Sequence, residues 1–584
     1  MAMKYIKFLY KEKGMRKFFV LMAALFLTLC MAIPVFASGR SQSSSSSASG
    51  TMTIEMYNRA ANYTGIQPGW FGHILKDKFN IQLNVIAPQV SGEALFQTRS
   101  AAGNLGDIVL LDNAQYMDSI RAGLIKDISG VIRNYPNLMT WWSQIDAYNK
   151  AIPNAGTRVY GIPLQMTNTS PTSYSQFSVY SSPWLPWDLY NAAGAPRLRN
   201  LNDLLDVLEA IQKANPRGID GNPAFAISLW PDWDVTSIEN VNQTLKWYGA
   251  EVASGEPTSS ILLDYQNRIK PLTDDNGEYL KMLRFFFDAN QRGLVDPDSG
   301  TQQWDQIVTK IQNRRIYLWW YSWQRGFWNS TERGNSRQNF IQIPVDDMRI
   351  FQDGDTYYGG GRVIGVGSRV DDAKLTRIMQ LLDWLASPEG LDVMYNGIKG
   401  FNYRVLPDGT YVRTPEGERA FSDMTLRVPA EYGGGVWNDG NSWINQWIAH
   451  DVSKNPLTGY PYLWDFWPAE IEKAQTTTQR EWAAKYGAAN QVEYLKKNNQ
   501  IGIVPYINAI LPSDPTDIAL VRSQCGTVVK DTSWRMIFAR DAAEFNRLWN
   551  DMKTQLNGFG WQRLVQYDTQ KFQAIVNARN EAMR

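Results

Sequence analysis

Soon after the amino-terminal region, apolar and polar residues alternate along the chain. Met52, Ile54 and Met56 alternate with polar residues, which is typical of a β-strand with one buried face. Residues 107–112 (DIVLLD) form a nearly continuous apolar run, which is typical of a parallel strand buried on both faces. A helical segment at 69–79 lies between these strands. The alternation of strands and helices predicts α/β layers with mostly parallel sheets.

Two later segments have the apolar stripe of a helix that packs on a core. The first carries Leu201, Leu204, Leu205, Leu208 and Ile211, with Asn200 as the expected N-cap. The second carries Leu375, Ile378, Leu381, Leu382 and Leu385. It ends at Ser387-Pro388, because proline cannot continue a helix. Both stripes are those of ordinary globular helices.

Residues 1–37 have the layout of a secretory signal peptide. Basic residues precede an apolar run at 18–30, and 35–37 (VFA) place small residues where a signal peptidase cuts. We expect cleavage after Ala37 and a flexible Ser-rich tether at 38–50. A lipid anchor at Cys30 is the alternative, but Leu29 is not the small residue that a lipobox requires. The sequence therefore predicts a periplasmic or extracellular protein.

Removal of residues 1–37 changes the charge balance of the chain. Six basic residues and one acidic residue leave, so the formal net charge falls from +1 to −4. This argues against a nucleic acid or an anionic membrane as partner, since both require a basic face. Cys525 then remains as a single cysteine, which excludes a disulfide within the mature chain. We expect a monomer without a cofactor.

Short motifs are spread over nearly the whole mature chain. They are 159–163 (VYGIP), 204–208 (LLDVL), 293–297 (GLVDP) and 382–390 (LDWLASPEG). Together with the signal peptide and the order of strands and helices, they resemble the family 1 extracellular solute-binding proteins. The resemblance is to the long members that bind oligosaccharides.

This resemblance implies a type II periplasmic-binding fold, in which crossing hinge segments join two α/β lobes, each a mostly parallel sheet flanked by helices. By analogy, lobe 1 comprises 51–166 and 345–400, and lobe 2 comprises 167–344 and 401–584. The first crossing falls at the YGIPLQ segment. The resemblance also implies an ABC permease in the inner membrane as partner.

Some long relatives carry a calcium loop rich in Asp and Asn. The corresponding segment here, 215–222 (NPRGIDGN), offers one carboxylate and an arginine. Calcium requires six to eight oxygen ligands, so we expect no metal in this loop.

The aromatic content is the strongest indication of the kind of ligand, because the chain holds 23 tryptophans and 28 tyrosines. This is more than a core of this size requires. A flat indole or phenol ring covers the apolar face of a pyranose, while polar neighbours hold its hydroxyls. The sequence therefore predicts a carbohydrate ligand, and the resemblance favours an oligosaccharide.

Ligands of open α/β sheets bind beyond the carboxyl ends of the strands. In lobe 1 this position selects Asn58, Tyr63, Trp70 and Asp112, although Asp112 could instead cap the helix that follows it. In lobe 2, LWPDWD after the expected strand 224–229 contributes Trp230, Asp232, Trp233 and Asp234. Further candidates are Trp320, Trp323, Arg362 and Trp437. For any single tryptophan, packing inside a lobe is the alternative.

Two other functions remain open at this point. A secreted glycan-degrading enzyme needs two carboxylates about 5–10 Å apart, and Asp232 and Asp234 are the nearest pair in the sequence. Because the chain has two histidines, zinc catalysis and a Ser-His-Asp triad are disfavoured, and we expect no catalytic residues. The other possibility is a peptide or another polar solute as ligand. Convergence of Arg59, Arg325 and Arg362 would favour an acidic sugar. We expect binding by hinge closure of the lobes.

Overall fold

A six-stranded sheet forms the centre of the first lobe. Its order is β2-β3-β1-β4-β13-β5, with β1, β3 and β4 parallel and β13 antiparallel to β4. The strands are β1 (Met52–Asn58), β2 (Gly65–Ile66), β3 (Ile81–Ile86), β4 (Ile108–Asp112), β5 (Ile162–Pro163) and β13 (Arg362–Val366). The apolar run predicted at 107–112 is β4, and its first four residues are buried. The register Arg362↔Asp112 places the start of β13 at the carboxyl end of β4.

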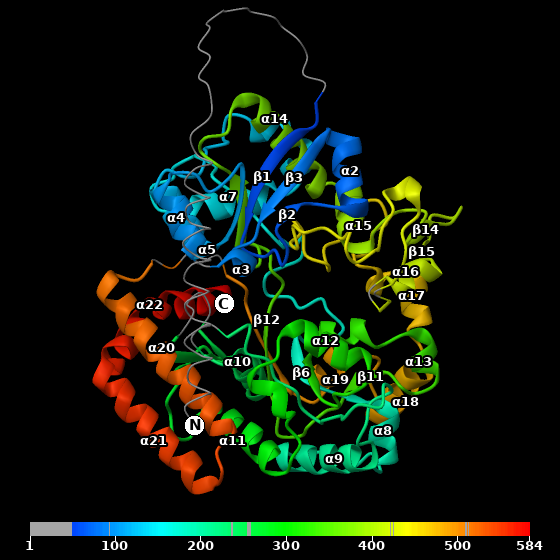
Figure 1. Cartoon of the computed structure of the whole chain (residues 1–584), viewed down its shortest axis with the longest axis vertical. Coiled ribbons are helices and arrows are strands. Elements are labelled where there is room, and N and C mark those ends of the chain that lie inside the picture. Colours follow the sequence, from blue (N-terminus) through cyan, green and yellow to red (C-terminus); the bar gives the residue numbers. More distant parts are fainter. Residues whose placement is uncertain are drawn as a thin grey trace, which may run out of the picture. The chain divides into compact units, whose positions relative to one another are not determined.

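Helices α2 (Gly69–Phe79), α7 (Trp142–Lys150), α14 (Asp372–Ala386) and α15 (Pro388–Asn396) pack around this sheet (Figure 1). The predicted helix at 69–79 matches α2, and the second predicted stripe is the buried face of α14. Ser387 ends α14 and caps α15, because its hydroxyl accepts the Gly390 N–H at 3.0 Å. The sequence pattern therefore located the main elements of lobe 1.

The computed structural model describes residues 50–583 except 93, 235–236, 254–258, 421, 424, 508–510 and 512. Thr51–Arg584 make up one compact unit. The expected signal peptide at 1–37, with Cys30, and nearly all of the expected tether at 38–50 lie outside the described residues. None of the described helices has the length and apolar composition needed to cross a membrane.

The second lobe is built on antiparallel strands. β6 (Ser181–Pro186) lies between β10 (Trp319–Tyr321) and β11 (Phe340–Gln342). Parallel pairing joins β12 (Ile350–Asp353) to β16 (Ile501–Val504). The expected strand at 224–229 pairs through isolated parallel bridges, Phe225↔Ile316 and Ile227↔Val295, and is therefore short and irregular. Helices α9 (Leu201–Ala214), α10 (Glu239–Leu245), α11 (Glu278–Gln291) and α12 (Trp304–Gln312) cover these strands.

Helix α9 follows the prediction closely. Four of the five residues of its predicted stripe are buried, and Leu201 at its first position is half-buried. The Asn200 side chain accepts the N–H groups of Asn202 at 3.0 Å and Asp203 at 3.2 Å. The expected N-cap is therefore confirmed.

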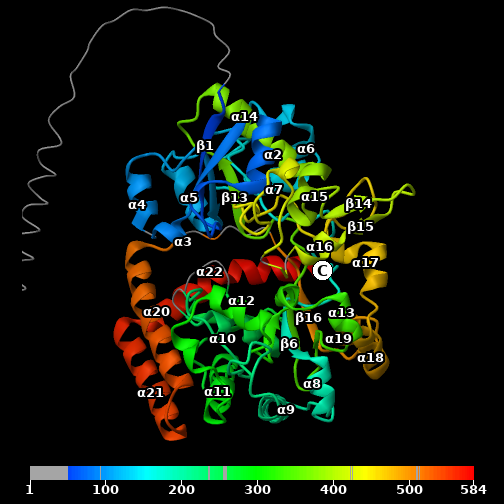
Figure 2. The same ribbon diagram turned by 45° about the vertical axis from the view of Figure 1, so that its right-hand side comes forward.

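Three long helices complete the carboxyl-terminal region. They are α20 (Thr516–Ile537), α21 (Ala542–Phe559) and α22 (Trp561–Ala582), and α20 packs beside α11 (Figure 2). Helix α22 contacts β8 (Ile261–Asp264) in the antiparallel sheet of β7 (Ala250–Val252), β8 and β9 (Ile269–Pro271). A buried ion pair joins α20 to α22, with 2.6 Å between Arg522 Nη2 and Asp568 Oδ1. The other oxygen of Asp568 accepts the Ser260 N–H at 2.9 Å, which links both helices to β8 (Ile261–Asp264).

A buried carboxylate joins two of the segments that cross between the lobes. Residues 164–180 lead from β5 to β6, and 354–361 lead from β12 (Ile350–Asp353) to β13. Asp355 in the second crossing accepts the hydroxyls of Thr169 at 2.7 Å and Ser175 at 2.6 Å from the first. Gly360 in the second crossing donates its N–H to Leu164 O at 2.7 Å. The two crossings therefore form one hydrogen-bonded hinge.

The buried clusters suggest a modified division of the chain. Apolar residues between 401 and 462, which the sequence placed in lobe 2, bury their side chains in the cluster that contains β1 and β4. The other large cluster contains residues from 179–350 and 482–564. We therefore propose that lobe 1 comprises 51–166 and about 362–467, and lobe 2 about 179–353 and 477–583.

Asp392 on α15 predicts a pH dependence of stability. It is 4% exposed, and its amide neighbours Asn396 and Asn455 lie at the long distances of 3.5 and 3.4 Å. Burial raises the pKa of Asp392 to about 7, against the opposing effects of Asn455, Tyr411, Lys399 and Asn396. Because the folded protein holds this proton more tightly than the unfolded chain, the free energy of unfolding falls as the pH rises from 4 to 8.

We therefore expect Asp392→Asn to raise the free energy of unfolding at pH 8, by on the order of 2 kcal/mol, and to have little effect at pH 4. Denaturant unfolding at both pH values measures this difference. The exposed Asp531 on α20 offers a matched control as Asp531→Asn. An unchanged pH dependence in Asp392→Asn would show that Asp392 stays ionised at low cost.

Candidate functional site

The carboxyl ends of β1 and β4 carry the first group of candidate residues. Asn58 ends β1 and is fully buried, so it offers no atom to a ligand in this conformation. Its Nδ2 donates to Trp443 O at 3.2 Å and to Ile444 O at 2.8 Å, and its Oδ1 accepts the Ala60 N–H at 2.8 Å. Asn58 therefore positions the segment that carries Trp443 at this edge of the sheet.

Two arginines share one carboxylate at the same edge. Asp112 Oδ1 lies 3.0 Å from Arg362 Nε, and Asp112 Oδ2 lies 3.6 Å from Arg59 Nε. Asp112 stands at the N-cap position of α5 (Asn113–Arg121), but its side chain makes no capping hydrogen bond. The carboxylate orients the two guanidinium groups instead.

The aromatic candidates of lobe 1 differ in exposure. Tyr63 is 51% exposed and stacks on Trp443, with ring centroids 5.3 Å apart and planes at 23°. Trp70 and Trp437 are buried and stack on each other at 4.5 Å, and Trp70 Nε1 donates to Trp437 O at 3.2 Å. Tyr63 thus presents a ring to solvent, whereas Trp70 and Trp437 are buried in the core of the lobe.

In lobe 2 the aromatic candidates form a two-layered cluster. Trp230 and Trp320 are each 1% exposed and lie nearly parallel, with centroids 5.5 Å apart. The half-buried rings of Trp233, Trp304 and Trp323 pack over them or against each other. We call these five residues together with Tyr321 the aromatic cluster. Its inner layer, formed by Trp230 and Trp320, fixes the positions of the rings that reach the surface.

Asp232 and Asp234 support this cluster through hydrogen bonds. Asp232 Oδ2 accepts the Trp304 N–H at 3.0 Å. Asp234 Oδ1 accepts the Glu239 N–H at 2.8 Å, and its Oδ2 accepts Trp534 Nε1–H at 2.7 Å. Burial raises the pKa of Asp234 to about 7. Because both oxygens of Asp234 are engaged by the protein, its geometry fits a support of the cluster better than a free catalytic carboxyl.

Helix α10 lies beside the aromatic cluster with a polar face that the sequence reasoning missed. Glu239 and Gln243 of α10 and Lys246, the residue that follows the helix, keep the spacing of one helix face and are half-buried. Glu239 Oε1 accepts Gln243 Nε2–H at 2.8 Å and Tyr321 O–H at 3.4 Å. The i, i+4, i+7 spacing of these polar residues, close after LWPDWD, was the available signal.

Tyr180 adds an exposed ring beside the aromatic cluster. It is 42% exposed, and its ring lies edge-on to Tyr321 at 5.5 Å. Burial raises the pKa of Tyr180, whereas Lys246 of lobe 2 and Arg362 of lobe 1 act to lower it. Figures 1 and 2 show α10 and α12 on the side of lobe 2 that faces lobe 1.

The loop at 215–222 lacks the ligands of a calcium site. Asp220 Oδ2 accepts Asn222 Nδ2–H at 2.8 Å, and Arg315 Nη1 lies 3.8 Å from the same oxygen. Arg217 donates to the carbonyl of Gly221 at 2.6 Å. The loop's own side chains thus occupy its acceptor oxygens, and one carboxylate cannot supply the ligand set of calcium. Within the described residues, no three His, Cys, Asp or Glu side chains are grouped to hold a metal.

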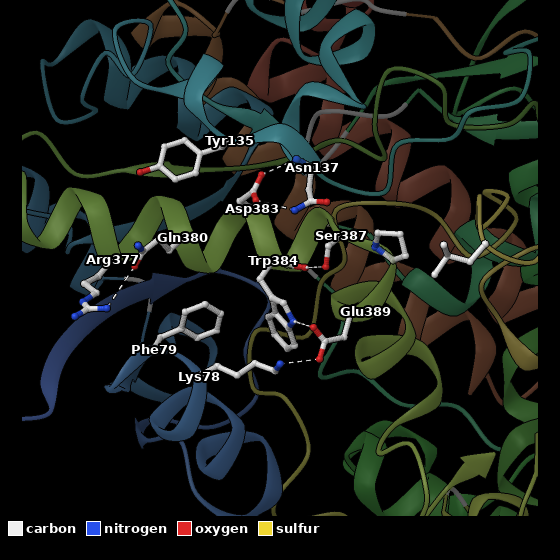
Figure 3. A pocket seen from close by; sticks show the side chains of 12 residues that line it. Lys78, Phe79, Tyr135, Asn137, Arg377, Gln380, Asp383, Trp384, Ser387 and Glu389 are labelled. Atoms are coloured by element: carbon white, nitrogen blue, oxygen red, sulfur yellow. Dashed lines mark hydrogen bonds and ion pairs between the residues drawn. The ribbon is translucent and has the colours of Figure 1, made fainter. Parts of the chain in front are cut away.

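A surface hollow of about 670 Å³ lies elsewhere on lobe 1, between α2, α14 and α15 (Figure 3). Lys78 and Phe79 line it just before β3 begins, which is the edge of the sheet opposite to the strands' carboxyl ends. The Glu389 carboxylate pairs with Lys78 at 2.7 Å and accepts Trp384 Nε1–H at 3.1 Å. Asp383 accepts two N–H groups of Asn137. Because protein partners engage these groups, the hollow is a poor match for a polar ligand.

The sequence model of the family "Bacterial extracellular solute-binding protein" matches residues 75–391, which is more than half of the chain. The chain belongs to this family, whose members bind solutes outside the cytoplasm. The resemblance inferred from the sequence is therefore confirmed. No curated protein matches the chain.

Solved structures of the same architecture cover almost the whole chain. The alginate-binding protein AlgQ2, solved without calcium ion, has a TM-score of 0.59 at 14% identity and covers 90% of this chain and 99% of its own. A solute-binding protein from Bifidobacterium longum infantis that binds HMO has a TM-score of 0.55 at 14% identity, covering 91% and 100%. FusA from S. pneumoniae, solved with kestose, has a TM-score of 0.55 at 14% identity, covering 89% and 99%. The two-lobed α/β class is thus confirmed.

The burial of Trp230 and Trp320 predicts that the inner layer of the aromatic cluster stabilises the folded protein. We expect Trp230→Ala to lower the free energy of unfolding by about 3–5 kcal/mol, because it removes a fully buried indole from a packed core. Denaturant unfolding followed by circular dichroism measures the loss. Trp323→Ala, at the half-buried surface of the same cluster, provides the comparison and should cost far less. Equal losses in the two variants would contradict the layered arrangement.

Proposed function

We propose that this protein is the substrate-binding component of an ABC importer. Its ligand is a carbohydrate of the oligosaccharide class, which it captures between its two lobes. The strongest support is the aromatic cluster at the surface of lobe 2, together with the exposed Tyr63 ring of lobe 1. Ring faces of this kind stack on the apolar faces of pyranoses. The polar face of α10 supplies hydrogen-bonding groups beside them.

The family and the structural neighbours add to this proposal. The family consists of binding proteins, not enzymes, and the named neighbours include proteins that bind alginate, HMO or kestose. We propose the same class of ligand for this chain, and an ABC permease in the inner membrane as its partner. A monomeric, periplasmic or extracellular protein fits this role. The roles of Tyr63, Trp233, Trp323, Arg362 and the other candidate residues in binding stay predictions.

The proposal predicts that removal of a surface ring weakens sugar binding. We expect Trp323→Ala to lower the affinity for the cognate oligosaccharide about tenfold or more, because a stacking contact of about 1–2 kcal/mol is lost. Calorimetry over a panel of oligosaccharides measures the affinity, and quenching of tryptophan fluorescence reports on the rings. Trp142→Ala is the matched control, since Trp142 lies under the Arg133 guanidinium in lobe 1.

Three results would contradict this function. Tight binding of peptides with no binding of any sugar would change the ligand class. Equal losses in Trp323→Ala and Trp142→Ala would remove the aromatic cluster from the site. Release of reducing ends from a polysaccharide, abolished by Asp234→Asn, would establish a glycan-degrading enzyme instead.

We propose further that the lobes close around the ligand and that an ion pair between them favours the closed form. Arg325 follows Trp323 in lobe 2 and pairs with Asp465. Asp465 belongs to lobe 1 in the proposed division, because the neighbouring Trp464 donates its N–H to Asn396 Oδ1 at 3.1 Å. Arg325 also donates to the Ser178 hydroxyl in the first crossing at 3.2 Å.

Breaking this pair should therefore shift the protein toward an open form. We expect Arg325→Asp to increase the radius of gyration in solution scattering and to lower ligand affinity up to about tenfold. The charge exchange Arg325→Asp with Asp465→Arg should restore both quantities, whereas Asp465→Arg alone should not. If the double exchange is as open as the single variants, or if the single variants remain compact, the pair does not control closure.

A further inference from the structure

A buried lysine lies on α12, the helix that begins with Trp304 of the aromatic cluster. Lys310, in the last turn of α12, is 7% exposed. Its Nζ donates to Asp296 Oδ2 at 2.5 Å, to Gln302 Oε1 at 2.7 Å and to Asp298 Oδ2 at 3.1 Å. An ammonium group has three N–H donors, so each of them has an oxygen acceptor here. We call the three acceptor side chains together the oxygen cage.

The oxygen cage belongs to the loop between α11 and α12. Asp296 caps the short helix η3 (Pro297–Gly300), because its Oδ1 accepts the Asp298 N–H at 3.0 Å. Asp296 and Gln302 are buried, whereas the side chain of Asp298 is 67% exposed. The cage therefore borders the core at Asp296 and Gln302 and the solvent at Asp298.

Two side chains of the cage also hold the segment that leads into Trp230. Asp296 Oδ2 accepts the Ser228 hydroxyl at 2.7 Å, and Gln302 Nε2 donates to Leu229 O at 2.6 Å. These groups are buried, where the loss of a hydrogen-bond partner costs most. The cage therefore ties this segment to the loop before α12.

The ammonium of Lys310 is the charge that this arrangement requires. Among the described residues, Lys310 forms the only salt bridges to Asp296 and Asp298. Removing one partner of a buried ion pair is strongly destabilising, because the other charge remains buried without compensation. The rings of Trp230 and Trp304, with centroids 5.1 Å apart, directly follow the two segments that the cage joins. Their relative position therefore depends on this charge.

We propose that the oxygen cage is a cation-binding site whose resident cation is the Lys310 ammonium, and that it positions the rings of Trp230 and Trp304 in the binding surface. Lys310 is thus a positioning residue, which acts on the ligand through the aromatic cluster. Once its side chain is shortened, the cage accepts a small primary ammonium ion, which offers the same charge and three N–H donors. The effect on sugar binding rests on the carbohydrate function proposed above, whereas the cation site does not.

Two variants separate the charge of Lys310 from the space that its side chain fills. Lys310→Ala removes the ammonium and leaves room for a cation, whereas Lys310→Met removes the ammonium and fills the space. We expect both to lower the melting temperature of the mature chain by about 5 °C. Added n-propylammonium should raise the melting temperature of Lys310→Ala in a saturable way and leave Lys310→Met and the unsubstituted protein unchanged. Tetramethylammonium, which has no N–H donor, controls for ionic strength.

Ligand affinity distinguishes a positioning residue from a merely structural one. Lys571 is buried, pairs with Asp514 at 2.9 Å and lies on α22, which carries no member of the aromatic cluster, so Lys571→Met is the matched control. Calorimetry uses the tightest-binding member of a panel that includes alginate oligosaccharides, HMO and kestose. We expect Lys310→Met to weaken its binding about tenfold and Lys571→Met to change it less than about twofold. In Lys310→Ala, n-propylammonium should restore the affinity.

The outcomes separate the cation site from the positioning role and from the carbohydrate function. No rise of the melting temperature with the amine in Lys310→Ala, or an equal rise in Lys310→Met, would overturn the cation site. Equal affinities of Lys310→Met and Lys571→Met would overturn the positioning role. If Lys310→Ala does not fold alone, recovery on refolding with n-propylammonium supports the site, and failure to recover contradicts it. If no saccharide binds the unsubstituted protein, the carbohydrate function fails, and the melting temperatures still decide the cation site.

Discussion

The buried carboxylate of Asp355 is the interaction on which the arrangement of the lobes depends. It lies in one crossing segment and is hydrogen-bonded by Thr169 and Ser175 of the other, so neither crossing can shift alone without leaving a buried charge unsatisfied. The crossings therefore move together. Gly359 and Gly361 follow Asp355 in the second crossing with φ values of +94° and +91°, a region that glycine adopts without strain. These glycines are the places where rotation costs the backbone least.

The aromatic cluster, the proposed binding surface, is held in place although its outer rings are only half-buried. Trp230 and Trp320 are enclosed in the core of lobe 2, and the half-buried Trp233, Trp304 and Trp323 pack around them. Asp232 and Asp234 fix the backbone of Trp304 and the start of α10 through hydrogen bonds. Rings held in this way lose little freedom when a ligand stacks on them, so less of the interaction is offset by ordering.

The sequence predicted the elements of lobe 1 well because their burial is regular. Alternation gave β1, the continuous apolar run gave β4, and the stripe and N-cap gave α9 in lobe 2. The candidate site was harder to predict, since composition does not tell which face of an indole is covered. Trp70, Trp230, Trp320 and Trp437 satisfy the same local patterns as Trp323, and tertiary packing encloses the first four.

For a related reason, the sequence did not show which polar candidates turn inward and which turn outward. Asn58 and Asp112 both follow strands at the expected edge, but Asn58 turns inward to backbone carbonyls while Asp112 turns outward to two arginines. The residues that Asn58 and Asp112 contact lie in segments that are distant in the sequence or follow a loop. Neither the i, i+2 period of a strand nor a capping rule contains that information.

Polar groups of the carboxyl-terminal helices reach both the proposed binding surface and the crossing segments. Trp534 of α20 donates to Asp234 below the aromatic cluster, and Arg579 of α22 donates to Asp353 at the end of β12, directly before the second crossing. The Arg522–Asp568 pair holds α20 against α22 between these points. Buried ion pairs add little net stability over apolar residues of the same size, but they require exact partners. Their value here is therefore geometric, because they set the position of the aromatic cluster relative to the strand that leads into the second crossing.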